Sequence, residues 1–246
     1  MNKYQILIEY VGTIYRGWQI QKKSKTIQGV LQEQISKLLK EKVTIVGSGR
    51  TDSGVHALAQ SAHFSCNNLI KNNEKFLKSI NHFLDGTQIS VIDIKKKSSD
   101  FHARFNAKER VYKYIILNRI SPSVVNEERN WHIRNKLNIT NMKKAAKKLE
   151  GTKDFSVFRA SSCNAKNPIR TIKSVKLKSM NDQIIIEFRS KSYLQQQVRS
   201  MVGSLKYVGE KKWSVKKFEK IIKSKKRELC APPAPAKGLY LTKIIY

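Results

Sequence analysis

The sequence predicts an α+β protein with two α/β domains, each a mainly antiparallel sheet with helices on one face. Three observations lead to this fold class. The chain has 246 residues, a length that suits two small domains or one large one. Its residues are 40% hydrophobic and 9% aromatic, which is enough material for packed interiors. Segments with the alternation of strands and segments with the three-to-four-residue spacing of helices also intermix twice along the chain.

The first half opens with apolar and polar residues that alternate as in a strand. Thr26 then has the side chain of a helix N-cap, and apolar residues recur behind it at helical spacing. The predicted elements of this half are a strand over 4–10, a helix over 27–39, strands over 43–46 and 59–66, a helix over 74–83 and a strand over 89–94.

The second half has the same mixture of elements. They are a strand over 110–117, a helix over 140–150 that ends at Gly151, a strand pair across the turn Asn181-Asp182, helices over 193–208 and 214–224, and a last strand over 239–246. The sequence therefore divides into a predicted N-terminal domain, 1–106, and a predicted C-terminal domain, 107–246.

The charge of the chain indicates a polyanionic partner. Lys and Arg total 49 and Asp and Glu total 18, which gives a formal net charge of +31. Such a charge favours a partner whose bound counterions are released on contact, and nucleic acid is the first candidate. An acidic membrane surface is the second, but no apolar run reaches the ~18 residues that span a bilayer. Residues 1–11 also lack the apolar core of a signal peptide.

The cysteines and histidines argue against a disulfide framework and a metal site. Cys66, Cys163 and Cys230 are odd in number and far apart, which favours a reduced, cytoplasmic location. The five histidines have no metal-ligand spacing, and the His-x-Glu and Cys-x-x-Cys motifs of zinc deaminases are missing. We therefore expect no metal.

The most unusual stretch is a glycine-rich loop over 47–57. Arg50, Thr51 and Asp52 lie between glycines that let the backbone turn sharply. The surrounding positive charge favours an ionised Asp52, as a nucleophile or general base requires. An Asp that accepts backbone N–H bonds in such a turn is an equally good interpretation of the local sequence. The lysine and spacing of a Walker loop are absent, which argues against nucleotide hydrolysis.

Two further segments combine basic and aromatic residues. Arg110, Tyr112 and Tyr114 share one face of a predicted strand, which could support an unstacked base, although an ordinary half-buried strand is the more common interpretation. Arg199 lies at the edge of the apolar stripe of a predicted helix, where it can reach a carboxylate or extend into water, and water is the default.

The run Gly49-Arg-Thr-Asp-Ser-Gly-Val-His-Ala57 closely resembles the signature loop of the tRNA pseudouridine synthase A family. Other motifs of this family have counterparts along the whole chain, in one order. They are Tyr10, Gly12-Thr13, Tyr15 and Gly17-Trp-Gln19 with Gln21; Thr26-Ile-Gln-Gly29; Phe101-His-Ala-Arg-Phe105; Arg110-x-Tyr112-x-Tyr114; Asp154-Phe155 with Phe158-Arg159; Val198-Arg199 with Val202-Gly203; and Ala234-Pro-Ala236 with Gly238-Leu239.

This resemblance implies roles for individual residues. Asp52 would be the catalytic aspartate, and Arg199 would pair with it and fix its orientation. Arg50 would help to displace the target nucleotide from its stem, and Tyr112 would pack on the flipped uracil.

By the same resemblance, Arg104 and His56 are assigned as further substrate-binding residues. The family also implies a homodimer, a basic RNA-binding cleft between the two domains, and a substrate that is uridine 38, 39 or 40 in the anticodon stem-loop of tRNA. No cofactor is implied, because the reaction changes no oxidation state. The expected activity is that of a tRNA pseudouridine synthase, an isomerase.

The chain departs from the family pattern at four positions that carry no proposed catalytic role. Val11 stands where Asp is common, Ser53 where Ala is usual, Gln197 where Met is frequent and Pro233 where Thr is common.

The chemical route of Asp52 stays open at this stage. It could attack the sugar, attack the base or take a proton from C2′. A different class of protein also competes, namely a non-catalytic RNA-binding protein that uses only the charge. That hypothesis gives no reason for Arg-Thr-Asp in a glycine-rich loop.

Overall fold

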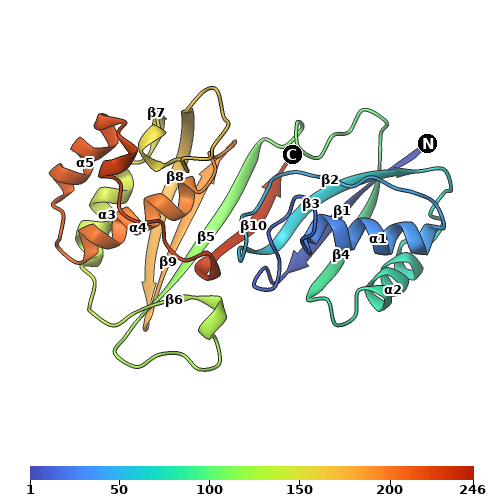
Figure 1. Ribbon diagram of the computed structural model, residues 1–246, viewed down its shortest axis with the longest axis horizontal. Helices are drawn as coiled ribbons and strands as arrows, with labels where there is room; N and C mark the ends of the chain where they lie inside the picture. Colours follow the sequence, from blue (N-terminus) through green and yellow to red (C-terminus); the bar gives the residue numbers. More distant parts are fainter. The chain divides into compact units, whose positions relative to one another are not determined.

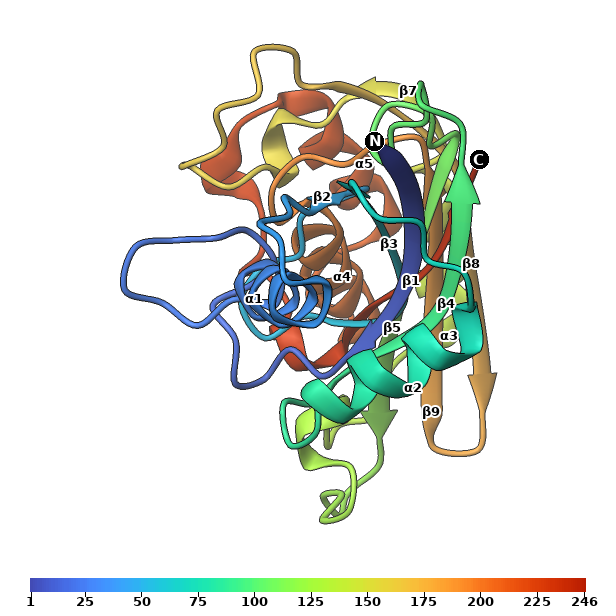
Figure 2. The same ribbon diagram turned by 90° about the vertical axis from the view of Figure 1, so that its right-hand side faces the viewer.

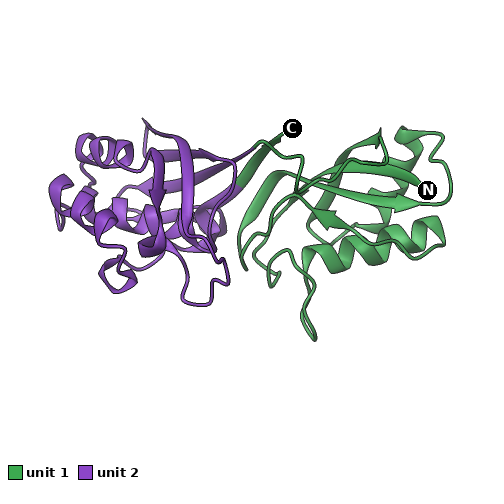
Figure 3. Ribbon diagram, turned by 90° about the horizontal axis from the view of Figure 1, so that it is seen from above, with its two compact units in different colours: residues 1–108, 241–246 green, residues 109–240 purple.

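The computed structural model describes residues 1–246, which form two compact units. Unit 1 comprises residues 1–108 and 241–246, and unit 2 comprises residues 109–240 (Figure 3). Residues 241–246 thus belong to unit 1, whereas the sequence-based division placed them in the second domain. Both units combine helices with a mainly antiparallel sheet, which confirms the α+β class.

Unit 1 is built on a sheet of three long antiparallel strands with β1 in the middle, flanked by β3 and β4. The short strand β2 pairs with β3. Two helices, α1 and α2, contact each other beside these strands (Figures 1 and 2). The elements of this unit are β1 (Asn2–Tyr10), α1 (Ile27–Leu39), β2 (Val46–Gly47), β3 (His56–Cys66), α2 (Asn73–Phe83) and β4 (Ile89–Lys97).

Unit 2 contains the strand order β5-β9-β8-β7, all antiparallel, with the short β6 parallel to β5. Its three helices pack on one another, and α3 also contacts β8 (Figure 1). The elements are β5 (Glu109–Asn118), β6 (Trp131–Ile133), α3 (Ile139–Lys147), β7 (Gly151–Asp154), β8 (Ile169–Met180), β9 (Gln183–Ser190), α4 (Gln197–Gly209) and α5 (Val215–Ser224), followed by β10 (Leu239–Ile245), which ends in unit 1.

Local sequence signals explain most of the helix boundaries. The Thr26 hydroxyl accepts a hydrogen bond from the Gly29 N–H and caps α1, as predicted, and Ser214 caps α5 through the Lys217 N–H. Helix α1 ends where Lys40 adopts a left-handed conformation with φ of 54°. None of the helices is long and apolar enough to cross a membrane.

The predicted strand over 43–46 is wrong except at its end. Only Val46–Gly47 pairs with a neighbouring strand. Polar side chains of α1 replace the strand partner for the rest: Ser36 accepts from the Val43 N–H, Gln32 accepts from the Ile45 N–H, and the Gln28 amide donates to the Ile45 carbonyl. Buried backbone groups need a partner, and here a helix provides it.

Helix α4 starts at Gln197, four residues after the predicted start at Tyr193. Gln196 has a φ of 59°, a left-handed conformation that a right-handed α-helix cannot contain, so the helix begins after it. The Gln197 side chain accepts a hydrogen bond from the Leu194 N–H and closes a turn before the helix. Gln197, one of the departures from the family pattern, therefore shapes the entry into α4.

His63 makes the stability of unit 1 depend on pH. Burial, and then the positive charges of His102 and Lys3, lower the pKa of His63 to about 4. Its Nδ1 accepts the Ala103 N–H at 3.1 Å, which requires that nitrogen to be unprotonated. The unfolded chain, with a histidine pKa of about 6.5, therefore binds a proton that the folded protein excludes between about pH 6.5 and pH 4.

We expect the free energy of unfolding to fall by up to about 3 kcal/mol through this group as the pH drops across that window. The variant His63→Asn keeps an acceptor near the Nδ1 position but cannot titrate, so its stability should fall less steeply. Urea unfolding of both proteins at pH 7, 5.5 and 4.5 measures the two slopes. Parallel curves for the two proteins would contradict the assignment.

Candidate active site

The predicted catalytic loop lies between β2 and β3, and the preceding turn over 12–18 supports it. Trp18 is buried and packs directly on Gly47, where an added Cβ would lie 2.5 Å from the indole ring. The backbone N–H of Trp18 donates to the Thr51 carbonyl at 3.1 Å. Gly17, with a φ of 88°, lets the two backbone segments approach, because a Cβ there would lie 2.7 Å from the same carbonyl oxygen.

Side chains fix the loop on both sides of Asp52. The Thr51 hydroxyl bonds to the Tyr10 hydroxyl at 2.8 Å in the interior. The Ser53 hydroxyl donates to the Tyr15 carbonyl at 3.0 Å. This bond gives a physical reason for Ser53, where alanine is usual in the family pattern. Residues adjacent to Asp52 are thus held from two directions.

Asp52 itself is half-buried and Arg50 is exposed, while Thr51 between them is buried. The Asp52 carbonyl accepts the Val55 N–H at 3.2 Å, which closes a tight turn whose Gly54 has a φ of 78°. A half-buried carboxylate on a restrained loop can reach a substrate while its position stays defined. Preorganisation of this kind is what a nucleophile or general base requires.

His56 follows the loop at the start of β3 and is buried. Its Nδ1 accepts the N–H of Gly12 at 3.1 Å. Gly12 approaches this strand so closely that a Cβ would lie 2.0 Å from the Val55 carbonyl oxygen. His56 therefore ties the first turn of unit 1 to the loop, and its assignment as a substrate-binding residue stays a prediction.

Arg104, also in unit 1, lies on an exposed turn after β4. Its guanidinium carbon lies 5.7 Å from the centre of the Phe105 ring. Three of the predicted site residues, Arg50, Asp52 and His56, thus share one loop and the strand that follows it, and Arg104 lies on a separate turn of the same unit.

Tyr112 lies on β5 of unit 2, opposite Phe188 of β9, and is buried. Its ring meets the Tyr193 ring edge-on, with the centroids 5.3 Å apart. The Tyr193 hydroxyl donates to the Arg110 carbonyl at 3.3 Å. The rings of Tyr112 and Tyr114 are both buried, so the basic and aromatic face, the less common of the two interpretations of this strand, is largely interior.

Arg199, in the first turn of α4, is half-buried and fixed by the segment that contains Ala234. Its Nε donates to the Ala234 carbonyl at 2.7 Å, and the Ala234 N–H donates back to the Arg199 carbonyl at 2.9 Å. The neighbouring Tyr114 hydroxyl donates to the Pro235 carbonyl. Burial raises the pKa of Tyr114 well above its usual value, against the effect of the Arg199 charge. The guanidinium of Arg199 is therefore held at a defined place by its hydrogen bond to the Ala234 carbonyl.

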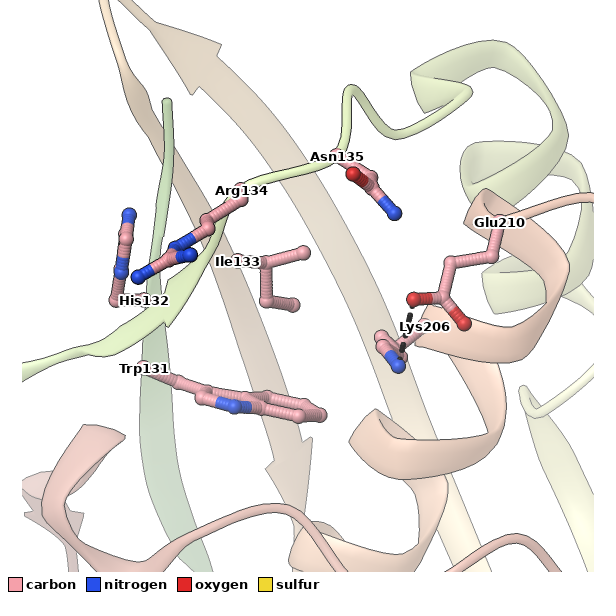
Figure 4. A pocket seen from close by; sticks show the side chains of 7 residues that line it. All are labelled: Trp131, His132, Ile133, Arg134, Asn135, Lys206 and Glu210. Atoms are coloured by element: carbon pink, nitrogen blue, oxygen red, sulfur yellow. Dashed lines mark ion pairs between the residues drawn. The ribbon is translucent and has the colours of Figure 1, made fainter. Parts of the chain in front are cut away.

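A cavity of about 290 Å³ in unit 2 contains none of the predicted site residues (Figure 4). Trp131 lies at one side, and Lys206 and Glu210 form an ion pair at 2.6 Å on the other. Burial alone would raise the pKa of Glu210, but hydrogen bonds from Lys206 and Lys212 outweigh it and lower that pKa. Glu210 is thus a carboxylate neutralised by two lysines, which makes it a poor alternative to Asp52.

Comparisons with known proteins identify the family of the chain. The family model described as tRNA pseudouridine synthase matches residues 6–106 and 145–246. The chain belongs to the tRNA pseudouridine synthase family. It is 64% identical over its full length, and over the full length of the relative, to the tRNA pseudouridine synthase A of Pelagibacter ubique. It is 44% identical, again over both full lengths, to the tRNA pseudouridine synthase A of a Thermoanaerobacter species.

Membership of this family confirms the resemblance found in the motifs. The supporting roles of Tyr10, Gly17 and Trp18 were not predicted, although all three stand in those motifs. The sequence feature that could have indicated these supporting roles is Gly17 directly before Trp18, because a glycine there suggests that two backbone segments approach closely beside a packed ring.

Proposed function

We propose that this protein converts uridine to pseudouridine in tRNA. The observation that carries the proposal is the 64% identity over the whole chain to a protein named tRNA pseudouridine synthase A. The loop over 47–57 supports it, because it holds a half-buried carboxylate beside an exposed arginine. The net charge of +31 suits an RNA substrate.

The reaction breaks the bond between C1′ and N1 and forms a bond between C1′ and C5. The C5 hydrogen leaves as a proton and N1 gains one, so atoms and electrons balance without a cofactor. Asp52 is the proposed catalytic residue, by attack on the sugar, by attack on the base or by removal of the C2′ proton. One carboxylate suffices if the detached uracil is retained and rotated, whereas glycoside hydrolysis normally uses two.

The remaining site residues are proposed to bind the target nucleotide or to orient Asp52. We propose that Arg50, which is exposed in the loop, helps to displace the target from its stem, a step that costs a few kcal/mol. Tyr112 packs on the flipped uracil, and Arg199 acts as the cationic partner of Asp52. Arg104 and His56 are the further substrate-binding residues of the proposal, and His56 also holds the loop through the Gly12 N–H.

The finer assignment also rests on the family. We propose uridines 38, 39 and 40 of the anticodon stem-loop as targets, the cytoplasm, where tRNA is modified, as the location, and a homodimer as the working form. The loop after β5 supports a dimer, because Ile120, Val124 and Val125 are each at least 84% exposed there.

Release of tritium from tRNA that carries C5-tritiated uridine tests the activity directly. Each isomerisation replaces the C5–H bond, so the purified protein should release tritium in proportion to the pseudouridine formed. A protein that binds this tRNA but releases no tritium would be the non-catalytic RNA-binding protein of the competing hypothesis.

Two substitutions at Tyr112 separate ring packing from hydroxyl chemistry. Tyr112→Phe keeps the ring and its edge contact with Tyr193, and is expected to retain most tRNA affinity while changing turnover. Tyr112→Ala removes both and should lower kcat/KM further, by about 5- to 150-fold for the lost stacking. The tritium assay measures both variants. Full activity in both would exclude Tyr112 from the site.

A further inference from the structure

Phe105 is an exposed aromatic ring outside the proposed catalytic loop. It has 72% of its surface exposed, compared with 43% for Phe83. A single exposed apolar side chain is ordinary in proteins. The surroundings of Phe105 are not ordinary, because several contacts hold the ring in one place.

The turn beneath Phe105 is closed by the preceding histidine. The His102 Nδ1 accepts the N–H groups of Arg104 at 3.2 Å and Phe105 at 3.3 Å. The Asn106 N–H donates to the His102 carbonyl at 3.0 Å, and the Asn106 side chain accepts the His102 N–H. The His102 and Phe105 rings then stack, with the centroids 4.2 Å apart and the planes 28° apart.

The turn is also attached to the sheet of unit 1. The Ala103 N–H donates to the Nδ1 of the buried His63, and the Ala103 carbonyl accepts from the Tyr246 hydroxyl at 2.9 Å. The His63 and His102 rings meet with their centroids 4.9 Å apart. The turn that carries the exposed Phe105 ring is therefore held in place by contacts with the core of unit 1.

Basic residues flank Phe105 in the sequence, and one of them lies beside its ring. The guanidinium carbon of Arg104 lies 5.7 Å from the Phe105 centroid. Lys97 lies over the neighbouring Phe101 ring at 5.3 Å, and Lys108 is exposed after the turn. Asp100 is the one acid between Lys97 and Lys108. A fixed aromatic ring with a cation beside it is the arrangement that binds a base and its phosphate in unpaired RNA.

We propose that Phe105 is a stacking platform for an unpaired base of the RNA substrate, with Arg104 on the adjacent phosphate. The base extends the stack of His102 and Phe105 by one ring. This inference rests on the proposed function, since it names a contact with the same substrate. It adds a determinant that favours a single-stranded segment over a continuous duplex.

The test compares binding by Phe105→Ala, Phe105→Tyr and Arg104→Ala. The probes are an unmodified tRNA transcript and an RNA duplex of similar length without unpaired bases, and dissociation constants are measured at several salt concentrations. Phe105→Ala should weaken tRNA binding by roughly 5- to 150-fold without changing the salt slope or the affinity for the duplex. Phe105→Tyr, which keeps a ring, should bind as the unchanged protein does. Arg104→Ala should make the salt slope shallower by about 0.7 to 0.9.

Three results would overturn the proposal. They are an unchanged tRNA affinity in Phe105→Ala, an equal loss for the duplex, and conversion of a dimer to monomers by Phe105→Ala, which would make the ring a contact between two copies of the chain. Because the ring is exposed, thermal unfolding of the variant should match the unchanged protein. Tritium release by the unchanged protein is measured separately, so failure of the activity and failure of the platform are distinct results.

Discussion

Asp52→Asn is expected to abolish pseudouridine formation while the protein still binds tRNA. The substitution keeps the size of the side chain, and Thr51 and Ser53, which restrain the loop through hydrogen bonds to Tyr10 and Tyr15, are unchanged. An amide is neither a nucleophile nor a base, so kcat should fall by roughly 10⁴-fold or more. Tritium release measures turnover, and a binding titration with the same tRNA measures affinity.

Asp93→Asn is the matched control. It removes the same charge from the same unit, and Asp93 is engaged in a partly exposed ion pair with Lys95 at 3.1 Å. Any general effect of one lost negative charge on RNA affinity appears in both variants, whereas loss of turnover should be confined to Asp52→Asn. Normal turnover in Asp52→Asn would remove Asp52 from the chemistry and with it the proposed mechanism.

If Arg199 acts through Asp52, the two residues form one functional group. Substitution of Arg199 in the Asp52→Asn background should then add little to the loss, because effects of residues that act together are not additive.

The predicted helices and strands were correct where residues within the segment mark its ends, such as a helix N-cap or a turn. Thr26 and Ser214 cap their helices, and the turn at Asn181, with a φ of 49°, joins β8 to β9. The strand predicted over 43–46 failed because its partner is not a strand. Val43 and Ile45 are apolar and buried, as in a strand, but side chains from α1 satisfy their backbone. Such a partner is a tertiary contact, and no local pattern encodes it.

The candidate site likewise has features that the local sequence indicates and features that depend on contacts in the folded chain. Asp52 could be singled out from the sequence because the residue types of the glycine-rich loop and their spacing are local, and its catalytic role stays a prediction. The restraints on that loop come from Tyr10, Tyr15 and Trp18, which are more than 30 residues away in sequence. The burial of His56 and the hydrogen bonds between Arg199 and Ala234 likewise depend on segments that meet only in the folded chain.

Gly17→Ala is expected to damage activity and stability together, because Gly17 sets the distance between the supporting turn and the catalytic loop. A methyl group there would lie 2.7 Å from the Thr51 carbonyl oxygen and 3.2 Å from the backbone of Asp52 and Ser53. These are backbone atoms, so the loop itself must move. A displacement near 1 Å at a reacting group lowers turnover by about 10²-fold. The strained φ of 88° and the clash should together cost about 2–4 kcal/mol in the free energy of unfolding.

Gly86→Ala separates the clash from the strain. Gly86 also has a positive φ, 68°, but an added Cβ meets nothing within 4 Å. Gly86→Ala should therefore lower the free energy of unfolding only by the cost of placing alanine at a positive φ, about 1–2 kcal/mol in denaturant unfolding. Its tritium release should be unchanged. If both variants lose the same stability and both keep full turnover, contact with the loop is irrelevant to its function. A loss of turnover confined to Gly17→Ala, with tRNA still bound, instead indicates that the position of the Asp52 loop, and not only the carboxylate it carries, limits the reaction.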